Sequence, residues 1–411
     1  MKLEEKPKKI FFFGHFDSTN FGNESTLQAI LYHLRCFQPN AEITCISTGP
    51  EATAAIHHIK AVPLAEAFLR PSSSRNPVLR AIRMVFIGVP SELYRLIKGI
   101  RMLKGTDMLI IPGTGLLTDA YGLLGWGPYT LLKWSLIARI CRCKILFVSI
   151  GAGPIYGTLG RYFVRTILSL ADFRSYRDDS TKVYLKGIGF PADKDPIYPD
   201  LAFSLPESVI PHGPTPKHSR CVVGLGVMAY AGSYSVVKND TTYTKYMETL
   251  VALAAWLIAH DYEIRLLSGD IADTNAREMF CDLLKKRLSP HDKEQRGHVF
   301  NESIHSVEDL FSQISATDFV VATRFHNALF ALLCNKPTIS ISFHHKCDSL
   351  MSAMGISEYS LDINELKADG MVEKFCDLET NAARIRPLIE ARAKEFRQAL
   401  DEQYKLIFNE L

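Results

Sequence analysis

The sequence lacks a long hydrophobic run, a cysteine framework and any marked excess of charge. Its charged start, MKLEEKPKK, leads into an apolar run too short for a signal-peptide core or a membrane-spanning helix. The nine cysteines are scattered, and the close pair Cys141 and Cys143 has no second Cys or His pair at the spacing of zinc ligands. These absences predict a cytoplasmic protein with neither a disulfide framework nor a metal site.

Charge and composition narrow the class of protein further. Lys and Arg number 47 against 44 Asp and Glu, a net charge of +3, and no basic run with interleaved aromatics is present. Nucleic acid is therefore not an expected partner. Hydrophobic residues at 47% and charged residues at 22% are typical of globular proteins, and 411 residues exceed what one hydrophobic core usually serves. The chain is expected to fold into two domains.

Short apolar runs alternate with longer segments of helical period along the chain. This alternation is typical of βαβ units around a parallel sheet, and it occurs both before and after a Pro- and Ser-rich stretch at 204–219. We predict an α/β protein with Rossmann-like domains at 1–208 and 209–378 that face each other across a cleft, and a long C-terminal helix at 379–411. The predicted strands are Ile10 to Gly14, Glu42 to Ser47, Met108 to Pro112, Lys144 to Ile150, Phe173 to Tyr176, Cys221 to Val227, Glu263 to Leu267, Asp318 to Ala322 and Thr338 to Ser342.

The first predicted strand bears on cofactor use. It leads into Gly14-His15-Phe16-Asp17 and not into the Gly-x-Gly-x-x-Gly turn that lets a dinucleotide pyrophosphate approach the backbone. A nicotinamide cofactor is therefore not expected.

One apolar segment carries several basic residues, NPVLRAIRMVFIGVPSELYRLIKGIRM at 76–102, with Gly88 and Pro90 inside it. One interpretation is a pair of packed or surface helices. The other is a docking site for a membrane or a lipid-linked substrate, because basic amphipathic helices lie on anionic surfaces.

The strongest local signal is Arg324-Phe325-His326, which follows a buried strand ending at Ala322. We expect Thr323 to cap a helix whose N-terminus favours an anion. Arg324 adds a forked donor for carboxylate or phosphate, and His326 is able to move protons near neutral pH. The alternative is that Arg324 pairs with a carboxylate such as Asp318 and that His326 only packs in the domain.

A further cation follows the next predicted strand. Lys346 comes after that strand ends at Ser342, so it is expected at a neighbouring strand end. It is equally consistent with an ordinary surface charge.

These features, with others in order along the chain, resemble the signature of the polysaccharide pyruvyl transferase family. The Arg-x-His turn precedes an aliphatic helix, an x-Pro-strand and a Lys before a short helix ending at Met354-Gly355. Upstream, the matching landmarks are Asn20-Phe21-Gly22-Asn23-Glu24, Pro112-Gly113-Thr114-Gly115-Leu116-Leu117, Gly151-Ala152-Gly153-Pro154, Tyr176-Arg177-Asp178 and Asp200-Leu201-Ala202-Phe203. Two positions depart from the family pattern: Asn23 replaces an Asp and Thr114 replaces a Gly.

The resemblance implies a fold similar to GT-B glycosyltransferases and a transfer of pyruvate from phosphoenolpyruvate to two hydroxyls of a sugar, as a cyclic ketal. It implies His326 as the acid that protonates the methylene carbon, and Arg324 as the group that stabilises departing phosphate. Phosphoenolpyruvate is then a substrate, no cofactor is needed, and the acceptor is a free, polymeric or lipid-linked saccharide. The acceptor is then expected to bind the N-terminal domain, and phosphoenolpyruvate the C-terminal domain. The expected substrate-binding residues are Lys346, Arg177, Asn20, Gly22, Glu24, Gly113, Gly115 and His15.

The base for the acceptor hydroxyl is not assigned by these patterns. Candidate carboxylates that follow predicted strands are Asp17, Glu24, Asp119 and Asp270, for each of which the alternatives are a helix cap and a solvated loop charge. Two other functions fit the same architecture, a nucleotide-sugar glycosyltransferase and a non-catalytic carbohydrate-binding protein.

Overall fold

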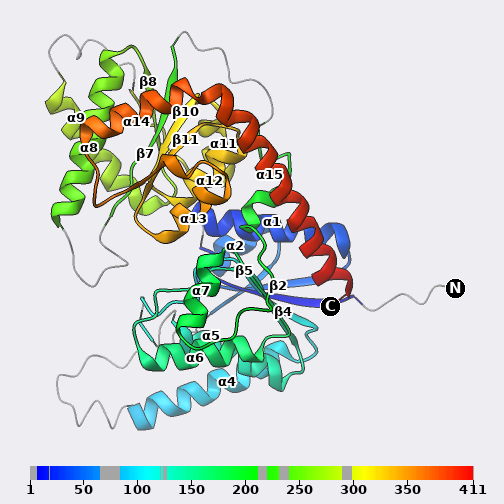
Figure 1. Cartoon of the computed structure of the whole chain (residues 1–411). Helices are drawn as coiled ribbons and strands as arrows, with labels where there is room; N and C mark the ends of the chain where they lie inside the picture. Colours follow the sequence, from blue (N-terminus) through cyan, green and yellow to red (C-terminus); the bar gives the residue numbers. More distant parts are fainter. Residues whose placement is uncertain are drawn as a thin grey trace. The chain divides into compact units, whose positions relative to one another are not determined.

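The computed structural model describes residues 7–17, 19–64, 84–120, 122–123, 127–211, 220–230, 240–288 and 299–410. Contacts within the chain divide it into two compact units (Figure 1). The first unit comprises Met1–Asp17, Leu34–Arg177 and Thr181–Ile197, and the second comprises Ser18–His33, Asp178–Ser180 and Tyr198–Leu411. An early stretch of the sequence, 18–33, thus belongs to the second unit. Part of the predicted linker, 212–219, lies outside the described residues.

The first unit contains a six-stranded parallel sheet in the order β3-β2-β1-β4-β5-β6. β4 and β5 are apolar and almost wholly buried, as expected of parallel strands covered on both faces. Its strands are β1 (Lys9–Phe13), β2 (Glu42–Ser47), β3 (Lys60–Pro63), β4 (Met108–Pro112), β5 (Lys144–Ile150) and β6 (Phe173–Tyr176). Its helices are α2 (Pro50–His57), η1 (Met84–Gly88), α4 (Val89–Leu103), α5 (Pro128–Ile140), α6 (Thr158–Leu170) and most of α7 (Asp179–Gly187).

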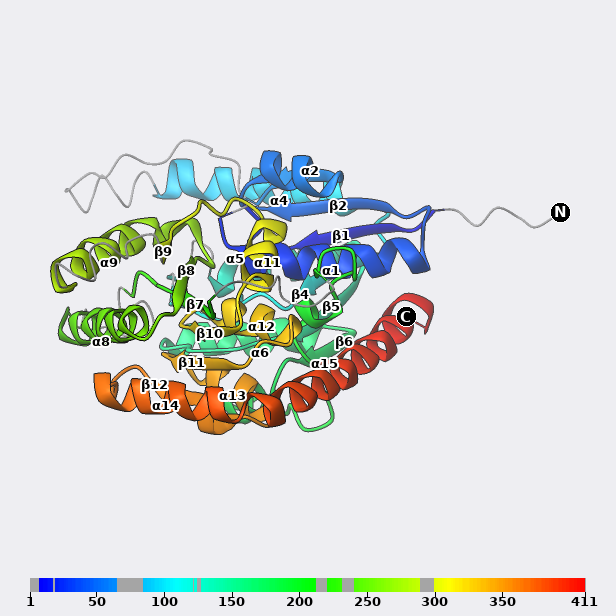
Figure 2. The ribbon, with the colours of Figure 1, turned by 90° about the horizontal axis from the view of Figure 1, so that it is seen from above.

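The second unit repeats this topology. Its parallel sheet has the order β12-β11-β10-β7-β8-β9, and Figure 2 shows these strands side by side. The strands are β7 (Val222–Gly226), β8 (Glu263–Leu267), β9 (Val299–Phe300), β10 (Phe319–Ala322), β11 (Thr338–Ser342) and β12 (Ser360–Asp362). Around them lie η2 (Leu201–Ser204), α8 (Asp240–Ala259), η3 (Ile271–Asp273), α9 (Thr274–Arg287), α11 (Val307–Ser315), α12 (Phe325–Leu333), α13 (His345–Ala353), η5 (Ser357–Tyr359), α14 (Ala368–Thr380), α15 (Ala382–Lys405) and η6 (Leu406–Glu410).

Helix α1 (Phe21–Phe37) begins in the second unit and ends in the first. Residues 21–33 of this first helix after β1 group with the part of the chain that follows 198 in the sequence. This assignment brings the Asn20 to Glu24 turn into the same unit as Arg324 and His326.

Both sheets have a switch point, where the chain reverses the direction in which it adds strands. In the first sheet the switch point lies between β1 and β4, and in the second it lies between β7 and β10. Ligands of open α/β sheets bind outside the carboxyl ends of the strands at this position. The first switch point is followed in sequence by His15 and Gly113, and the second by Arg324 and His326.

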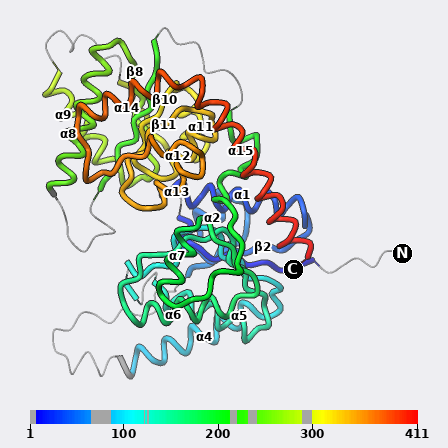
Figure 3. Tube along the Cα trace, viewed as in Figure 1, coloured from blue at the N-terminus to red at the C-terminus, as the bar shows by residue number. Residues whose placement is uncertain are grey.

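The predicted α/β class with two Rossmann-like parts is confirmed. The missed strands, β3, β9 and β12, are short and lie at or next to a sheet edge, so they lack the apolar run that marks a buried strand. The long C-terminal helix is confirmed as α15, which runs through Pro387 near its start. Figure 3 traces it in red at the end of the chain.

Candidate active site

The ends of β7 and β10 are joined at the switch point of the second sheet. The hydroxyl of Thr323, directly after β10, donates to the carbonyl oxygen of Gly226 at 3.0 Å and lies 2.9 Å from the hydroxyl of Tyr246. The prediction that Thr323 caps α12 is wrong, because this hydroxyl is engaged with Gly226 and the N-cap residue is Arg324. The side chain of Arg324 makes no capping bond. The first turn of α12 therefore presents backbone N–H groups and the positive end of the helix dipole without a side-chain cap.

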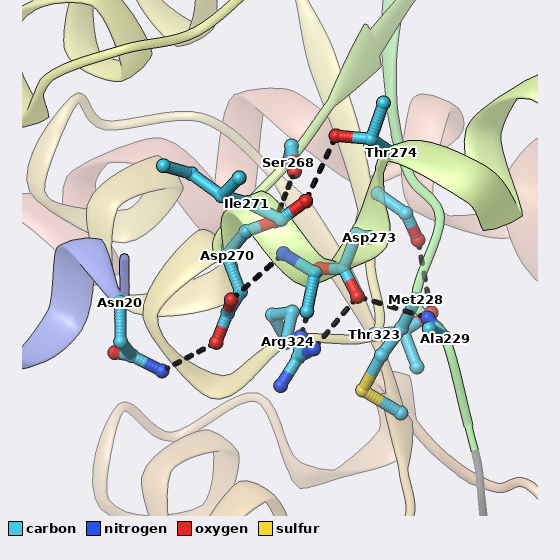
Figure 4. A network of polar contacts seen from close by, with 12 residues as sticks. Asn20, Met228, Ala229, Ser268, Asp270, Ile271, Asp273, Thr274, Thr323 and Arg324 are labelled. Carbon is cyan, nitrogen blue, oxygen red and sulfur yellow. Dashed lines mark hydrogen bonds and ion pairs between the residues drawn. The ribbon is translucent and has the colours of Figure 1, made fainter. Parts of the chain in front are cut away.

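Arg324 is held by a buried carboxylate. Its Nε donates to Oδ2 of Asp273 at 2.9 Å and its Nη2 donates to Oδ1 at 2.6 Å (Figure 4). Asp273 is fully buried and also accepts the N–H of Ala229 at 2.9 Å. The partner is thus Asp273 and not Asp318, whose carboxylate accepts the N–H of Val222. A guanidinium has five N–H donors, of which this pair uses two, so Asp273 orients Arg324 without using up its donors.

His326, in the first turn of α12, lies between a glycine of α1 and a buried carboxylate. A Cβ on Gly22 would be 1.8 Å from Nδ1 of His326, so only glycine fits under this ring. Nε2 of the ring lies 4.0 Å from Oδ2 of Asp200. Asp200 is buried, and its other oxygen accepts the N–H of Ala202 at the start of η2. The position of the imidazole is therefore set from two sides.

Asn20 directly precedes α1 and connects it to the loop after β8. Its Oδ1 accepts the N–H of Asn23 at 3.2 Å, the usual bond of an N-cap residue. Its Nδ2 donates to Oδ2 of Asp270 at 3.0 Å, as Figure 4 shows. Because both functional ends of the amide bond the protein, the structure gives Asn20 a supporting role.

The rest of this turn is held in the same way. The N–H of Phe21 donates to the carbonyl oxygen of Gly269 at 3.3 Å, and Glu24 is buried in the first turn of α1. Gly22 is thereby held against His326, although about three hundred residues separate the two in the sequence.

Asn327, the residue after His326, was not predicted. Its side-chain amide is fully buried, and neither its nitrogen nor its oxygen has a hydrogen-bond partner among the described residues. The amide fills space left by Gly226 at the end of β7 and by Gly269 in the loop after β8. A Cβ on Gly226 would be 3.1 Å from Nδ2, and a Cβ on Gly269 would be 2.6 Å from Oδ1. Buried amides are rarely left unsatisfied, so this one marks the switch point as a polar site.

Lys346 lies in the first turn of α13. Its ammonium is 5.5 Å from the ring centroid of Phe325 and 5.6 Å from that of Phe343. Phe325 stands between Arg324 and His326 in the sequence, so the second unit brings all three predicted residues to one end of its sheet.

The first unit contains the remaining predicted residues. A Cβ on Gly113 would be 2.5 Å from the carbonyl oxygen of Ser149, so the close approach of two loops requires glycine there. Gly115 has open space at the corresponding position, and sterics do not explain its glycine. The guanidinium of Arg177 packs on Gly151, whose Cβ would be 2.4 Å from Nη2.

His15 follows β1 and is neutral at physiological pH. Burial lowers its pKa to about 4, and the negative charge of Asp17 opposes this shift only in part. A neutral imidazole is able to accept one hydrogen bond and donate another, which suits a hydroxyl ligand.

Two of the carboxylates considered as bases hold helix starts. Asp119 accepts the N–H groups of Tyr156 and Gly157, both at 2.8 Å, directly before α6. Asp270 accepts the N–H of Ala272 at 3.0 Å and caps η3. Sequence patterns left the cap and the base open for these residues. The contacts favour the cap for Asp270, whereas Asp119 holds the loop before α6, whose N-cap Gly157 has no side-chain capping bond.

Within the described parts of the chain, no group of three or more His, Cys, Asp or Glu side chains is arranged to hold a metal ion. No helix formed by those residues is long and apolar enough to cross a membrane.

Solved structures share the fold over nearly the whole chain. The S. aureus MnaA–UDP co-structure has a TM-score of 0.60 at 12% identity, covering 97% of this chain and 96% of that one. HepE from Anabaena in complex with UDP has a TM-score of 0.57 at 11% identity, with coverage of 96% and 99%. A glycosyltransferase from Rickettsia africae has a TM-score of 0.56 at 12% identity, with coverage of 98% and 100%. At such identities the likeness establishes the fold alone.

Comparisons of sequence establish the family to which the chain belongs. The amylovoran biosynthesis protein AmsJ of Erwinia amylovora is 19% identical, and the alignment covers 92% of this chain and 95% of AmsJ. The model of the polysaccharide pyruvyl transferases matches residues 20–345, a span that runs from the Asn20 cap to the residue before Lys346. This chain therefore belongs to the polysaccharide pyruvyl transferase family.

Proposed function

We propose that this protein transfers pyruvate from phosphoenolpyruvate to two hydroxyls of a saccharide, as a cyclic ketal, in the biosynthesis of an exopolysaccharide or other cell-surface glycan. One observation carries the proposal. His326 lies in the uncapped first turn of α12, with Asp200 at 4.0 Å and the anchored Arg324 two residues before it. A proton donor and an anion-binding helix start are what this donor substrate requires.

The reaction begins at the methylene carbon of phosphoenolpyruvate. His326 donates a proton to this carbon, which becomes a methyl group, and the adjacent carbon takes on oxocarbenium character. A sugar hydroxyl then forms a bond to that carbon and loses its proton. A general acid of this kind usually contributes about 10²- to 10⁴-fold in rate.

The second half breaks the bond between that carbon and the phosphate oxygen. Phosphate leaves with the electron pair and takes up a proton, and the second hydroxyl attacks the same carbon and loses its proton. Two protons are released by the hydroxyls, one is retained in the methyl group and one departs with phosphate. The products are the cyclic ketal and inorganic phosphate.

The residues divide this work according to charge. The N–H groups at the start of α12 and the guanidinium of Arg324 favour the phosphate, because charge-assisted and helix-terminal donors bind anions strongly. Lys346 is proposed as a further cation for the donor substrate, and Asn327 offers a buried amide at the same switch point. Arg177, in the first unit, stays a proposed substrate-binding residue. The carboxylate of Asp200, 4.0 Å from Nε2, is proposed to orient the ring.

On the acceptor side we propose the loops of the first unit. His15 supplies a neutral imidazole, and the loop of Gly113 and Gly115 follows the neighbouring strand end. The acceptor is a free, polymeric or lipid-linked saccharide.

The test is to incubate the purified protein with phosphoenolpyruvate and a panel of glycans. We expect acceptor-dependent phosphate release and a pyruvate ketal by mass spectrometry. A His326→Gln variant that keeps the melting temperature should lose ketal formation by at least about 10²-fold. Nucleotide release from a nucleotide-sugar, with no phosphate release from phosphoenolpyruvate, would support the glycosyltransferase alternative. Binding of glycans with neither reaction would support a carbohydrate-binding protein.

Arg324 needs a variant that separates binding from folding. Removal of its side chain would strand the buried carboxylate of Asp273, which typically costs about 3–5 kcal/mol in stability. Arg324→Lys keeps a cation near Asp273 but loses the two-bond fork. We expect its KM for phosphoenolpyruvate to rise while the protein stays folded, and an unchanged KM would remove Arg324 from the anion site.

A further inference from the structure

Helix α4 has an apolar face that its own unit leaves exposed. Phe86 is 74% exposed, Leu93 57% and Ile97 43%, and with Val89 they recur every three to four residues. This spacing places them on one stripe of the helix. The backbone runs from η1 into α4 without a break, because Gly88, with φ −65° and ψ −50°, is helical. Of the segment predicted from 76 to 102, residues 76–83 lie outside the described residues.

The other faces of α4 pack against the first unit. Gly99 approaches Ile137 of α5 so closely that a Cβ would be 2.7 Å from its Cδ1, and Leu103 is fully buried. Figures 1 and 3 show α4 at the outer margin of this unit, where it packs against α5. The exposed stripe is therefore distinct from the face with which α4 packs against the core.

The charge of α4 is positive toward solvent. Glu92, the one acidic residue among 89–103, accepts the ammonium of Lys133 at 2.8 Å, the hydroxyl of Tyr129 at 2.9 Å and the guanidinium of Arg95 at 3.1 Å. Burial alone would raise the pKa of Glu92, but the hydrogen bond and charge of Lys133 lower it. The charge of Glu92 is thus balanced by cations of the same unit, while Arg101 and Lys104 at the end of the helix are exposed.

The start of α4 lies at the carboxyl edge of the first sheet. Glu92 near the start of α4 bonds Tyr129 at the start of α5, and α5 begins after the loop that leaves the carboxyl end of β4. The most exposed apolar residue, Phe86, precedes this point. The stripe therefore begins at the sheet edge that also carries His15 and Gly113.

We infer that the α4 stripe docks the first unit on the surface of an anionic lipid bilayer. Apolar side chains on one face with cations beside them are what an interfacial helix needs, since the former enter the acyl boundary and the latter meet anionic headgroups. The inference rests on these exposures and charges and not on the reaction proposed above. It does explain how a lipid-linked acceptor would arrive at the carboxyl edge of this sheet.

The experiment is co-sedimentation of the full chain with vesicles of phosphatidylglycerol and phosphatidylcholine, compared with phosphatidylcholine alone. We expect binding to the mixed vesicles that weakens as salt is added. Leu93→Glu/Ile97→Glu should weaken binding at least about tenfold, because it removes apolar area and adds repulsion. Arg101→Glu should weaken it about fivefold or more, given the worth of one basic residue at such a surface.

The matched control is Val183→Glu, which changes an apolar side chain of α7 in the same unit that is 69% exposed. It should bind vesicles as the parent does, and all variants should keep the parent melting temperature. Equal binding by the double variant and the parent would overturn the inference. So would sedimentation equilibrium that shows a dimer which the double variant converts to a monomer, combined with no vesicle binding by the parent.

Discussion

At the scale of single residues, the contact between Gly22 and His326 gives the sharpest prediction. In Gly22→Ala the new methyl group would overlap the imidazole, so His326 must leave its position near Asp200. We expect a loss of pyruvyl transfer of about 10²-fold or more, since that is the usual worth of a positioned acid. Phosphate release and melting temperature are the two measurements.

The control for this substitution is Gly370→Ala in α14. A Cβ at Gly370 has no neighbour within 4 Å, so Ala fits and should stabilise the helix by roughly 0.5–1 kcal/mol without loss of activity. Full activity in Gly22→Ala would show that the imidazole need not occupy this position.

His15 predicts a pH dependence of stability. Its folded-state pKa of about 4 lies below the ordinary value of 6.5, because burial disfavours the charged ring. The unfolded chain therefore binds more protons between these values, and stability falls as the pH falls through this window. From pH 7 to pH 5 the free energy of unfolding should fall by about 2 kcal/mol through His15, and His15→Gln should abolish this contribution.

Urea denaturation of the parent and of His15→Gln at the two pH values checks this. His305→Gln, at an exposed histidine, controls for the removal of one histidine. If His15→Gln and the parent lose the same free energy of unfolding over this interval, His15 is not buried in its neutral form.

Single residues also mark the limit of sequence reasoning. The placement of Arg324 and His326 could be predicted, because a strand end and a helix start stand next to each other in the sequence there. Their partners Asp273 and Asp200 could not be assigned, since they come from other loops and no local pattern links them to α12. Asn327 carries no signal in sequence, because what sets it apart is a buried amide without a hydrogen-bond partner among the described residues.

At the scale of elements, the start of α6 tests a residue that sequence patterns left undecided. Asp119 accepts two backbone N–H groups before this helix. Asp119→Ala should lower the free energy of unfolding by about 1–2 kcal/mol, because two hydrogen bonds from the loop before α6 to a charged acceptor are lost. Asp119→Asn, which keeps an acceptor oxygen, should lose less. Denaturant titration measures both, and a large loss of turnover with unchanged stability would make Asp119 the acceptor base.

The strands that could be predicted from the sequence are those buried in the sheets. β4 and β5 are continuous apolar runs covered on both faces, and their predicted bounds agree with the structure. β3 and β12 have intermediate or exposed residues at sheet edges, where sequence offers little apolar signal. The cap of α12 was misjudged because a threonine before a helix satisfies the sequence rule, while the fold uses Thr323 to join two strands.

At the scale of the whole molecule, membership of the two units does not follow the order of the sequence. Residues 18–33 lie within the first Rossmann repeat in sequence, yet they group with the second unit. No composition shift marks this exchange, since α1 is one continuous helix. The signal that found the turn was its resemblance to a family motif, and that signal did not say which unit the turn serves.

This assignment makes a prediction for the binding of phosphoenolpyruvate. If the donor substrate binds at the start of α12, backbone amides at 325–328 should exchange hydrogen more slowly in its presence. Amides at 21–24 should be protected in parallel, because Gly22 packs on His326 and Asn20 is tied to Asp270. Hydrogen exchange followed by mass spectrometry, with and without phosphoenolpyruvate, measures both segments. Asp273→Asn weakens the anchor of Arg324 and should reduce both protections together. Protection confined to the loop of Gly113 and Gly115, with none at 325–328, would move the donor substrate to the first unit.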